Sequence, residues 1–504
     1  MPESRRQLLP HLVVLRLSGD IGTKSRPTQA RFLGRLMRNL KDALRAEELR
    51  AHIVRTHNRI FVEASEARAS AVLARVFGIQ SISPAERRSV TTLDDVVEAG
   101  FEIFAERVRA KHFAVRARRV GDRTPRSLSS RAVENALGRR LLPLSAGVNL
   151  DAPEVTAFVE LCSGEAYFFP ERVAGPAGLP LGVEGRAVAL VSGGFDSAVA
   201  AWLVQKRGVA LDHVFCNLGG AAHEAGVLRV MKTLADRWSY GSAPRLHAID
   251  FRPLAEQLQA RTQPRYWQVL LKRLMLRAAE AVARERGAAA LITGEALGQV
   301  SSQTLANLAV ITPAVSAPVL RPVIGMNKDE ILAIARAIGT YELSAVVGEY
   351  CALASGRPAT EAHLAPVLAE EEKLDLTWLA NAVIARKVVH LRSLDLESVA
   401  AGPAELELDL VPPDAIVIDL RTRAAYQGWH WPGALWMEFA HAAAAYPKFD
   451  PHRNYLVYCE FGLKSAYLAE LMRKSGLRAY NFRGGLRRLV AHAEARGMSG
   501  PERP

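Results

Sequence analysis

The sequence has few cysteines and no long apolar run. Its four cysteines, Cys162, Cys216, Cys351 and Cys459, are too few and too widely spaced for a disulfide framework or a zinc set. No apolar stretch reaches the ~20 residues that a membrane helix needs, and no small-residue cleavage site follows the short apolar run near the N-terminus. We therefore expect a reduced, cytoplasmic protein that has no signal peptide and no membrane contact.

Acidic residues are scarce only in the first part of the chain. Residues 1–150 contain 28 Lys+Arg and 15 Asp+Glu, whereas residues 151–504 contain 37 of each. The whole net charge of +13 therefore lies in the first third of the chain. A basic segment beside a neutral body indicates either a partner with a phosphate backbone or a solvated arginine-rich surface, and the charge count alone leaves both open.

A chain of 504 residues is too long for a single core, and we expect three or four domains of multidomain α/β and α+β type. The first, residues 1–85, has the order strand, helix, strand, strand, helix of a ferredoxin-like module. Its second helix is predicted over residues 65–78, closed by Gly78. The polar segment that follows contains Pro84 and is predicted to be a linker.

A second basic module, residues 86–174, is predicted to begin with a helix. The alternating segment 112–120 predicts a strand with arginines on one side and apolar residues on the other. A short helix is predicted to end at Gly138, and two further strands are predicted around Val148 and Ala166.

A linker rich in glycine and proline begins near residue 175. Apolar strands that alternate with helices then predict a parallel α/β sheet for residues 175–400. A second linker precedes a smaller α/β unit, residues 404–504.

The segment "VSGGFDS" follows a buried strand and opens a helix. Gly193 and Gly194 allow the backbone to approach an oxyanion, Ser192 and Ser197 add hydroxyls, and the helix dipole favours negative charge. No lysine stands where a Walker A motif has one, so this is not the common P-loop. The segment resembles the PP-loop of ATP pyrophosphatases, and a plain tight turn is the alternative interpretation.

The segment "LITGEALGQVSSQTLANL", residues 291–308, gathers polar groups just after an apolar strand. Ligands of parallel sheets bind at the carboxyl ends of the strands, so we expect a binding function here. Upstream, "LLKRLMLRAAE" places Lys272 and Arg273 on a helix, where on their own they would be surface charges.

Cys459 lies in a C-x-x-G-x-x-S loop between a strand and a helix. Such a loop directs backbone N–H groups and a helix N-terminus at one place, which favours a thiolate or persulfide anion on the cysteine. Lys464 would help this slightly and Glu460 would oppose it. A cysteine phosphatase needs arginine six residues after the cysteine, and that position is Ser465. Rhodanese-like features precede the loop, at Asp419, Arg421, His430, Pro432 and Gly433.

These motifs together resemble the tRNA 4-thiouridine synthetase family (tRNA uridine 4-sulfurtransferase, also linked to thiamine thiazole synthesis). The resemblance spans nearly the whole chain and includes "GDIGTKSRPTQARF", "SGGFDS", "LKRLML", "TGEALGQVSSQTLANL", "RPVIGMNKDEILAIARAIGTYE" and "YCALASGRPAT". It implies a ferredoxin-like domain, a THUMP domain, a PP-loop ATP pyrophosphatase domain and a C-terminal rhodanese domain, in the order of the four segments above.

The resemblance also implies ligands for these domains. It implies ATP as cofactor, with magnesium as charge partner and no metal site made by the protein itself, and tRNA as the partner of the basic segment. The implied ATP-binding residues are Leu190, Val191, Ser192, Gly193, Gly194, Asp196, Ser197, Phe215, Lys272, Gly294 and Gln303. The candidate tRNA-binding residues are Lys111, Arg116, Arg118 and Arg119.

The resemblance implies catalytic roles for two cysteines. On sequence alone, Cys162, Cys216 and Cys351 read as structural thiols. The family, however, has a working cysteine at the "YC" position, which is Cys351. A cysteine desulfurase would load a persulfide on Cys459, Cys351 would attack the Cys459 sulfur, and an external reductant would reset the resulting disulfide. A thiocarboxylate sulfur-carrier protein is a further implied partner. The alternatives are a sulfur relay for thiazole synthesis alone and a non-catalytic tRNA-binding protein.

Overall fold

The computed structural model describes most of the chain, and two compact units emerge from it. The described residues are 9–56, 59–121, 128–345, 347, 358–396, 399, 406–460 and 462–496. Cys351 lies outside them. The first unit comprises Met1–Glu184 with the short pieces Gln205–Val209 and Tyr240–Ser242, and the second unit comprises the rest. Within the described ranges, every helix is too short or too polar to cross a membrane.

The first unit is built on one nine-stranded sheet in the order β2-β3-β1-β4-β8-β7-β5-β6, with β9 beside β4. Its strands are β1 (His11–Leu17), β2 (Ala51–Thr56), β3 (Arg59–Ala64), β4 (Ile79–Ser89), β5 (His112–Arg119), β6 (Gly147–Val148), β7 (Val155–Cys162), β8 (Glu165–Phe169) and β9 (Val173–Ala174). Its helices are α1 (Gly19–Gly22), α2 (Arg26–Ala46), α3 (Ala69–Leu73), α4 (Leu93–Val108) and α5 (Ser130–Leu141).

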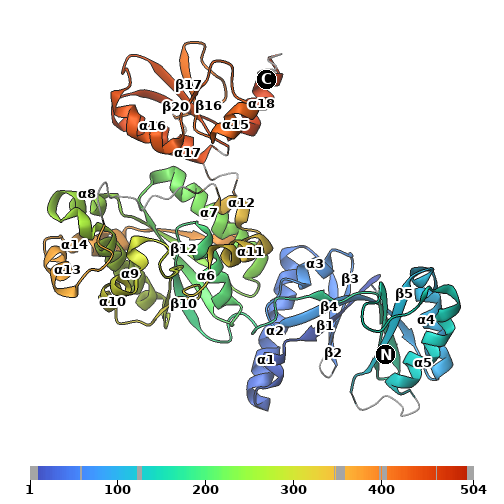
Figure 1. The fold of residues 1–504 in the computed structure, drawn as a ribbon. Helices are drawn as coiled ribbons and strands as arrows, with labels where there is room; N and C mark the ends of the chain where they lie inside the picture. Colours follow the sequence, from blue (N-terminus) through green and yellow to red (C-terminus); the bar gives the residue numbers. More distant parts are fainter. Residues whose placement is uncertain are drawn as a thin grey trace, which may run out of the picture. The chain divides into compact units, whose positions relative to one another are not determined.

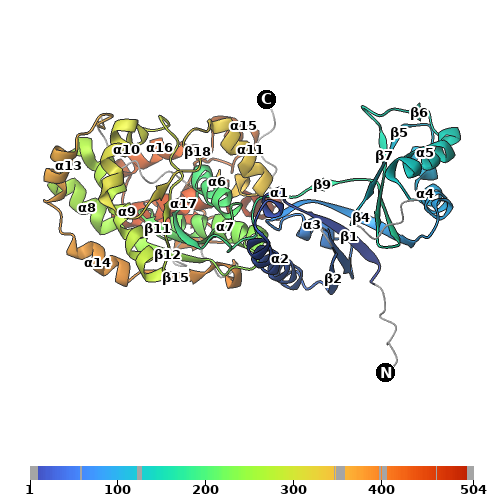
Figure 2. The same ribbon diagram turned by 90° about the horizontal axis from the view of Figure 1, so that it is seen from below.

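The polar segment that we predicted to be a linker is the long strand β4, so that prediction is wrong. Its first half pairs with β1 and its second half with β8, which joins the two predicted modules in one sheet (Figure 2). Pro84 lies opposite Val13 in the antiparallel ladder. A proline removes only its own N–H from the ladder, and the buried Ile79 and Ile82 on the same strand pack into the core.

Three further expectations for this unit need correction. The predicted helix 65–78 is reduced to the five residues of α3, because turns after α3 bury Val76 and Phe77 without further helix. The helix predicted to end at Gly138 continues to the end of α5. Strand β7 was not predicted, because it contains Glu160, a residue type that strands disfavour.

A buried ion cluster explains how β7 tolerates this glutamate. The Arg16 Nε donates to Glu160 at 2.9 Å and the Arg59 Nε donates to its other carboxylate oxygen at 2.7 Å. The Glu160 side chain is only 2% exposed. Because the three residues come from β1, β3 and β7, the cluster ties the two halves of the sheet together, and loss of one partner would leave a buried charge.

The second unit begins with a six-stranded sheet in the order β14-β13-β10-β11-β12-β15, parallel except for β15. Figure 1 labels β10 and β12 of this sheet among the surrounding helices. Its strands are β10 (Arg186–Leu190), β11 (Ala210–Asn217), β12 (Arg245–Asp250), β13 (Leu291–Ile292), β14 (Val319–Leu320) and β15 (Lys387–His390). The surrounding helices are α6 (Phe195–Gln205), α7 (Gly220–Trp238), α8 (Arg252–Arg261), α9 (Trp267–Arg286), α10 (Leu305–Ile311), α11 (Lys328–Ile338), α12 (Tyr341–Ser344), α13 (Leu364–Glu371) and α14 (Thr377–Ile384).

Arg273 is not the surface charge that its position on a helix suggested. Its side chain is 2% exposed, and its guanidinium donates to Glu371 at 2.5 Å and to the Val310 carbonyl at 2.6 Å. The neighbouring residue on α9, Lys272, points elsewhere and is described with the site below. Arg273 therefore links α9 to α13 through its ion pair with Glu371. The sequence pattern did not predict this role.

The chain ends in a five-stranded parallel sheet in the order β16-β20-β19-β17-β18. Its strands are β16 (Glu407–Leu408), β17 (Ala415–Asp419), β18 (Leu435–Trp436), β19 (Asn454–Tyr458) and β20 (Arg478–Phe482). Its helices are α15 (Arg423–Gly428), α16 (Phe439–Ala445), α17 (Leu463–Lys474) and α18 (Gly485–Glu494). Apolar clusters lie on both faces of β17 and β19, so this sheet has a core of its own.

Candidate active sites

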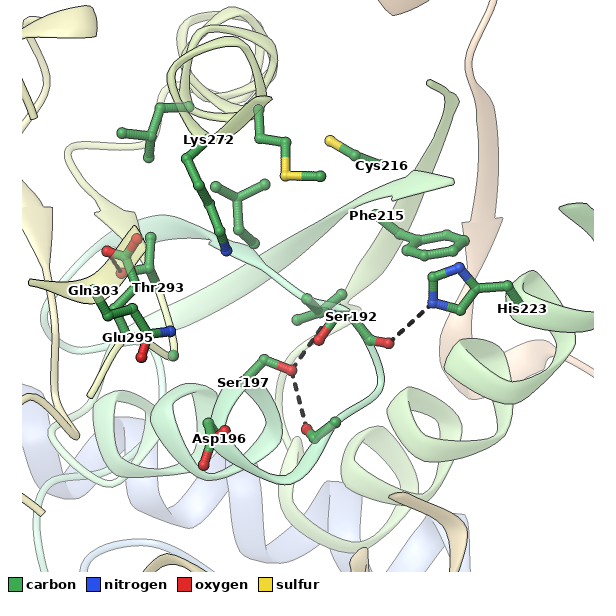
Figure 3. Close-up of a pocket in the computed structure, with 16 residues that line it drawn as sticks. Ser192, Asp196, Ser197, Phe215, Cys216, His223, Lys272, Thr293, Glu295 and Gln303 are labelled. Atoms are coloured by element: carbon green, nitrogen blue, oxygen red, sulfur yellow. Dashed lines mark hydrogen bonds between the residues drawn. The ribbon is translucent and has the colours of Figure 1, made fainter. Parts of the chain in front are cut away.

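The glycine-rich loop at the end of β10 forms the floor of a pocket (Figure 3). The Ser197 Oγ accepts from the Ser192 N–H at 3.3 Å and donates to the Gly194 carbonyl at 3.1 Å, which braces the loop from within. The loop then opens α6, whose first N–H groups have no partners within the helix. This arrangement is suited to bind an anion such as a phosphate.

Two glycines are required by the backbone here. Gly193 has φ +79°, in the left-handed region that favours glycine. A Cβ on Gly294, which follows β13, would lie 2.5 Å from the Ser197 N and 2.7 Å from the Asp196 C. The end of β13 therefore presses directly against the first turn of α6, which brings the two polar segments of the sequence together.

Side chains from β11, α7, α9 and the segment after β13 complete the pocket, whose cavity volume is about 150 Å³. Lys272 points from α9 into it (Figure 3). Gln303 is 8% exposed, and its Oε1 is buried without a hydrogen-bond partner among the described residues. A cation and an unsatisfied acceptor thus line one cavity. The predicted residues that line it are Leu190, Val191, Ser192, Gly194, Asp196, Ser197, Phe215, Lys272, Gly294 and Gln303.

The pocket also contains a histidine that was not predicted, His223. His223, in the first turns of α7, lies 3.3 Å from the Ser192 carbonyl through its Nε2 and packs against the Phe215 ring with the ring centroids 4.6 Å apart. Burial lowers the pKa of His223 to about 3, so the neutral ring donates to the carbonyl. No motif of the sequence pointed to this residue, because it approaches the loop only through the packing of α7.

A buried carboxylate also lines the pocket beside Gly294. Glu295 is 3% exposed and accepts from the Arg321 Nε at 2.7 Å and from the Thr293 hydroxyl at 2.9 Å. Glu295 belongs to the polar run after β13 that indicated a binding function, although it was not among the residues assigned to ATP. On the open side, Lys328 at the start of α11 pairs with the Asp196 carboxylate at 3.0 Å. Asp196 is therefore neutralised within the second unit.

Because several histidines are buried, we expect the free energy of unfolding to depend on pH in the acidic range. Burial lowers the pKa of His213, on β11, to about 4. The unfolded chain takes up a proton near pH 6.5, whereas the folded protein excludes it until about pH 4. The free energy of unfolding should therefore fall as the pH is lowered through this window, by at most about 1.4 kcal/mol per pH unit for each such histidine.

Urea unfolding between pH 7 and pH 4.5 measures this effect. His213→Phe should flatten the pH dependence, because the variant has one proton fewer to exclude. The matched variant His390→Phe, at an exposed position on β15, should retain the slope. An unchanged slope in His213→Phe would contradict the assignment.

The loop after β19 places Cys459 at the bottom of a second cradle. Its sulfur faces a cavity lined in part by Arg421, Phe439, Glu460 and Lys464. The Leu486 N–H donates to the Cys459 carbonyl at 3.0 Å and to the Glu460 carbonyl at 3.1 Å, which fixes the start of the loop. A helix of 12 residues, α17, begins behind the loop. The N-terminus of α17 can stabilise a sulfur anion on Cys459.

A second close approach of glycines supports this cradle. Gly462 has φ +80°, and a Cβ on it would lie 3.2 Å from the Gly485 N. Gly484, which caps α18, and Gly485, its first residue, both have positive φ as well. The loop after β20 therefore packs directly on the cysteine loop, and larger side chains would force the two apart.

The predicted pair Asp419 and Arg421 lies beside the same cavity, and Arg421 lines it. Asp419, fully buried, accepts from the Arg421 Nη2 at 2.7 Å and from the Tyr458 hydroxyl at 2.6 Å. Burial, together with the adjacent Asp419 carboxylate, raises the pKa of Tyr458 far above its ordinary value, so this hydroxyl stays protonated. The Tyr458 oxygen in turn accepts from the Trp431 N–H at 3.1 Å. The motif residues thus fix β17, β19 and the segment before β18 to one another.

The predicted tRNA-binding residues lie on and beside β5 in the first unit. Lys111, Arg116 and Arg118 are exposed and Arg119 is half-buried. Phe113 and Val115, between them in sequence, are buried in the core. The exposed cations are available to a phosphate backbone, and the Arg116 guanidinium also donates to the Leu150 carbonyl at 2.5 Å.

These features define a class of protein: an α/β domain of ATP-pyrophosphatase type, joined to a rhodanese-like domain and to a basic α+β unit. Four segments match known families. Residues 182–376 match the thiamine biosynthesis protein (ThiI), residues 12–83 the ThiI ferredoxin-like domain, residues 90–169 the THUMP domain and residues 403–492 the rhodanese-like domain. The chain belongs to the ThiI family of tRNA sulfurtransferases.

Relatives and a solved structure agree with this family. A tRNA sulfurtransferase of Pyrobaculum aerophilum is 37% identical over 478 residues, which cover 94% of this chain and 96% of the relative. A tRNA sulfurtransferase of Thermoplasma acidophilum is 35% identical over 492 residues, which cover 96% and 98%. A crystal structure of a 4-thiouridine synthetase–RNA complex with bound ATP has a TM-score of 0.65 at 29% identity, and covers 76% of this chain and 99% of that one. The predicted family, fold class and enzyme class are confirmed.

Proposed function

We propose that this chain transfers sulfur from a cysteine persulfide to a uridine of tRNA, with ATP as the activating substrate and 4-thiouridine as the product. One observation carries the proposal. The same chain holds an anion-binding pocket with Lys272 and a glycine-rich loop, and a separate cradle with Cys459. The first is suited to activate an oxygen and the second to deliver a sulfur.

The pocket fits a nucleotide. The backbone N–H groups at the start of α6 and the Lys272 ammonium would bind phosphate oxygens, and the unpaired Gln303 Oε1 would accept from an amino group such as that of adenine. Transfer of AMP to the uridine O4 would turn a poor leaving group into a good one and release pyrophosphate. The residues assigned to ATP in the sequence analysis keep that role in this proposal.

Magnesium would enter with the nucleotide. Among the described residues, no group of three or more His, Cys, Asp or Glu side chains is placed to hold a metal ion. Phosphate oxygens and waters would supply ligands, as is usual for this ion.

Sulfur would travel through two cysteines. The Cys459 thiolate would attack the outer sulfur of a desulfurase persulfide, and the desulfurase cysteine would leave as a thiolate. After activation of the uridine, Cys351 would attack the Cys459 sulfur, sulfide would leave toward C4, and a Cys351–Cys459 disulfide would remain. A dithiol reductant would restore both thiols.

The remaining partners and the location complete the proposal. Lys111, Arg116, Arg118 and Arg119 would contact the tRNA backbone, and the enzyme would act in the cytoplasm. Sulfur transfer for thiamine thiazole synthesis, through a thiocarboxylate sulfur-carrier protein, would be a second role of the same cysteines. The boundaries 1–85, 86–174, 175–400 and 404–504 stay predictions.

The test combines the purified chain with ATP, magnesium, unmodified tRNA, a cysteine desulfurase and cysteine. Nucleoside mass spectrometry of the digested tRNA should detect 4-thiouridine, and pyrophosphate release should depend on tRNA. Absence of both would favour a non-catalytic tRNA-binding protein. Rescue of a thiamine auxotroph without any thiolated tRNA would favour a relay for thiazole synthesis alone.

A further inference from the structure

A chain of buried polar groups leads away from the Cys459 sulfur. The Ser465 Oγ, on the first turn of α17, lies 3.3 Å from the Cys459 Sγ and 2.6 Å from the Asn481 Oδ1 on β20. The Asn481 Nδ2 lies 3.5 Å from the Glu407 Oε1 on β16. Ser465 and Asn481 have no exposed surface, and the Glu407 side chain is 7% exposed. The motif that marked Cys459 did not explain why these groups should be buried.

The chemistry of the groups fixes which atom donates. A carboxylate only accepts, so the Asn481 amide must turn its Nδ2 toward Glu407 and its Oδ1 toward Ser465. The Ser465 hydroxyl then has one proton and two acceptors, the Asn481 oxygen and the Cys459 sulfur. With a neutral thiol, the short bond to Asn481 holds that proton and the S–H can donate to the Ser465 oxygen. With a thiolate, the sulfur becomes the stronger acceptor.

We infer that Ser465 is a switchable hydrogen-bond donor to the Cys459 sulfur, and that Asn481, oriented by Glu407, holds its proton whenever the sulfur carries no charge. This inference rests on the proposed role of Cys459 as a persulfide carrier. The bond strengthens when negative charge is on Sγ and weakens when the charge moves to the outer sulfur of a persulfide. Ser465 is therefore a positioning residue for both formation and cleavage of the persulfide.

The two half-reactions can be followed with thiosulfate and cyanide. The Cys459 thiolate attacks the outer sulfur of thiosulfate, an Sγ–S bond forms, and sulfite leaves with the electron pair of the broken S–S bond. Cyanide then attacks the outer sulfur of the persulfide, thiocyanate leaves, and the electron pair of the Sγ–S bond returns to Cys459 as a thiolate. Charge is on Sγ at the start of the first step and at the end of the second, and Ser465 can donate at both.

Other charges face the same sulfur and stay in place in the test. Arg421 follows β17, Glu438 precedes α16, Glu460 follows Cys459 and Lys464 lies on the first turn of α17; all four line the cavity. Arg483, after β20, pairs with Glu407 at 3.1 Å. Arg421 lies 3.7 Å from Glu460. Since the variants below change none of these groups, a shift in reactivity reports on Ser465 and Asn481.

The test measures iodoacetamide alkylation of Cys459 in the full chain as a function of pH, by mass spectrometry of the peptide, together with thiocyanate formation. Ser465→Ala should shift the alkylation profile to higher pH by about one unit and slow thiocyanate formation about tenfold, as expected for loss of one hydrogen bond to a charged group. Ser465→Thr keeps the hydroxyl and should restore most of both.

Asn481→Leu should act in the opposite direction, because it removes the competing acceptor and leaves the Ser465 proton to the sulfur. Its alkylation profile should shift to lower pH. Ser475→Ala, an exposed serine at the end of α17, is the matched control and should change nothing. If thermal unfolding shows that Ser465→Ala is not folded, the direction of the pH shift in Asn481→Leu tests the inference.

An unchanged profile in Ser465→Ala, or shifts of both variants toward higher pH, would overturn the inference, since damage to the packing has no reason to produce opposite signs. A different result would count against the proposed function. If the wild type makes no 4-thiouridine while the alkylation shifts appear as expected, the hydrogen-bond switch stands and the assignment to tRNA thiolation does not.

Discussion

Replacing Cys459 by alanine is expected to abolish 4-thiouridine formation while tRNA-dependent pyrophosphate release continues. The cysteine lies in a cradle of its own, and the nucleotide pocket contains none of the cradle's residues. Activation of the uridine should therefore survive the loss of the sulfur carrier. Nucleoside mass spectrometry and a pyrophosphate assay on the same reaction separate the two steps.

Cys351→Ala is expected to lose multiple turnover as well, because no disulfide can form to release sulfide from Cys459. Cys162→Ala is the matched control: this thiol is buried at the end of β7 in the first unit and should be dispensable for turnover. Normal thiolation by Cys459→Ala or by Cys351→Ala would refute the two-cysteine mechanism.

Lys272→Met is expected to impair activation of the uridine instead of sulfur loading. It should reduce pyrophosphate release by about 10²–10³-fold, the usual cost of removing one preorganised group that stabilises developing charge. Its ammonium points into the pocket opposite the glycine-rich loop (Figure 3). Loading of the Cys459 persulfide by the desulfurase should remain, and labelled cysteine followed by gel autoradiography measures it.

Lys387→Met controls for the loss of a positive charge from the same domain. Lys387 is 64% exposed on β15 and pairs with Glu224 at 2.7 Å, outside the pocket. This variant should retain pyrophosphate release. If Lys272→Met releases pyrophosphate at the rate of the control, the pocket does not bind the phosphates as proposed.

Much of both sites could be predicted because their signals are local. The glycines of "SGGFDS" and the C-x-x-G-x-x-S loop need only a strand, a turn and a helix in succession, and the structure has these at α6 and α17. His223 escaped prediction for the opposite reason. It reaches the Ser192 carbonyl only because α7 packs against the loop, and no spacing in the sequence encodes that approach.

Strand β4 shows the same limit for the fold. Its polar residues and Pro84 resemble a linker when only neighbours in sequence are considered, yet β1 and β8 supply hydrogen-bond partners along its two halves. Arg273 is a second case, since a charged residue on a helix is buried only where a partner such as Glu371 meets it from a distant segment.

The sequence by itself determined the family and the order of the domains through its motifs, and it marked the candidate phosphate-binding loop and Cys459, because glycine placement and motif spacing act over short distances. Only the tertiary structure decided that one sheet joins the first two modules through Arg16, Arg59 and Glu160, and that Ser465 stands between the Cys459 sulfur and Asn481. Buried polar groups need partners, and folding selects those partners from segments that lie far apart in the chain.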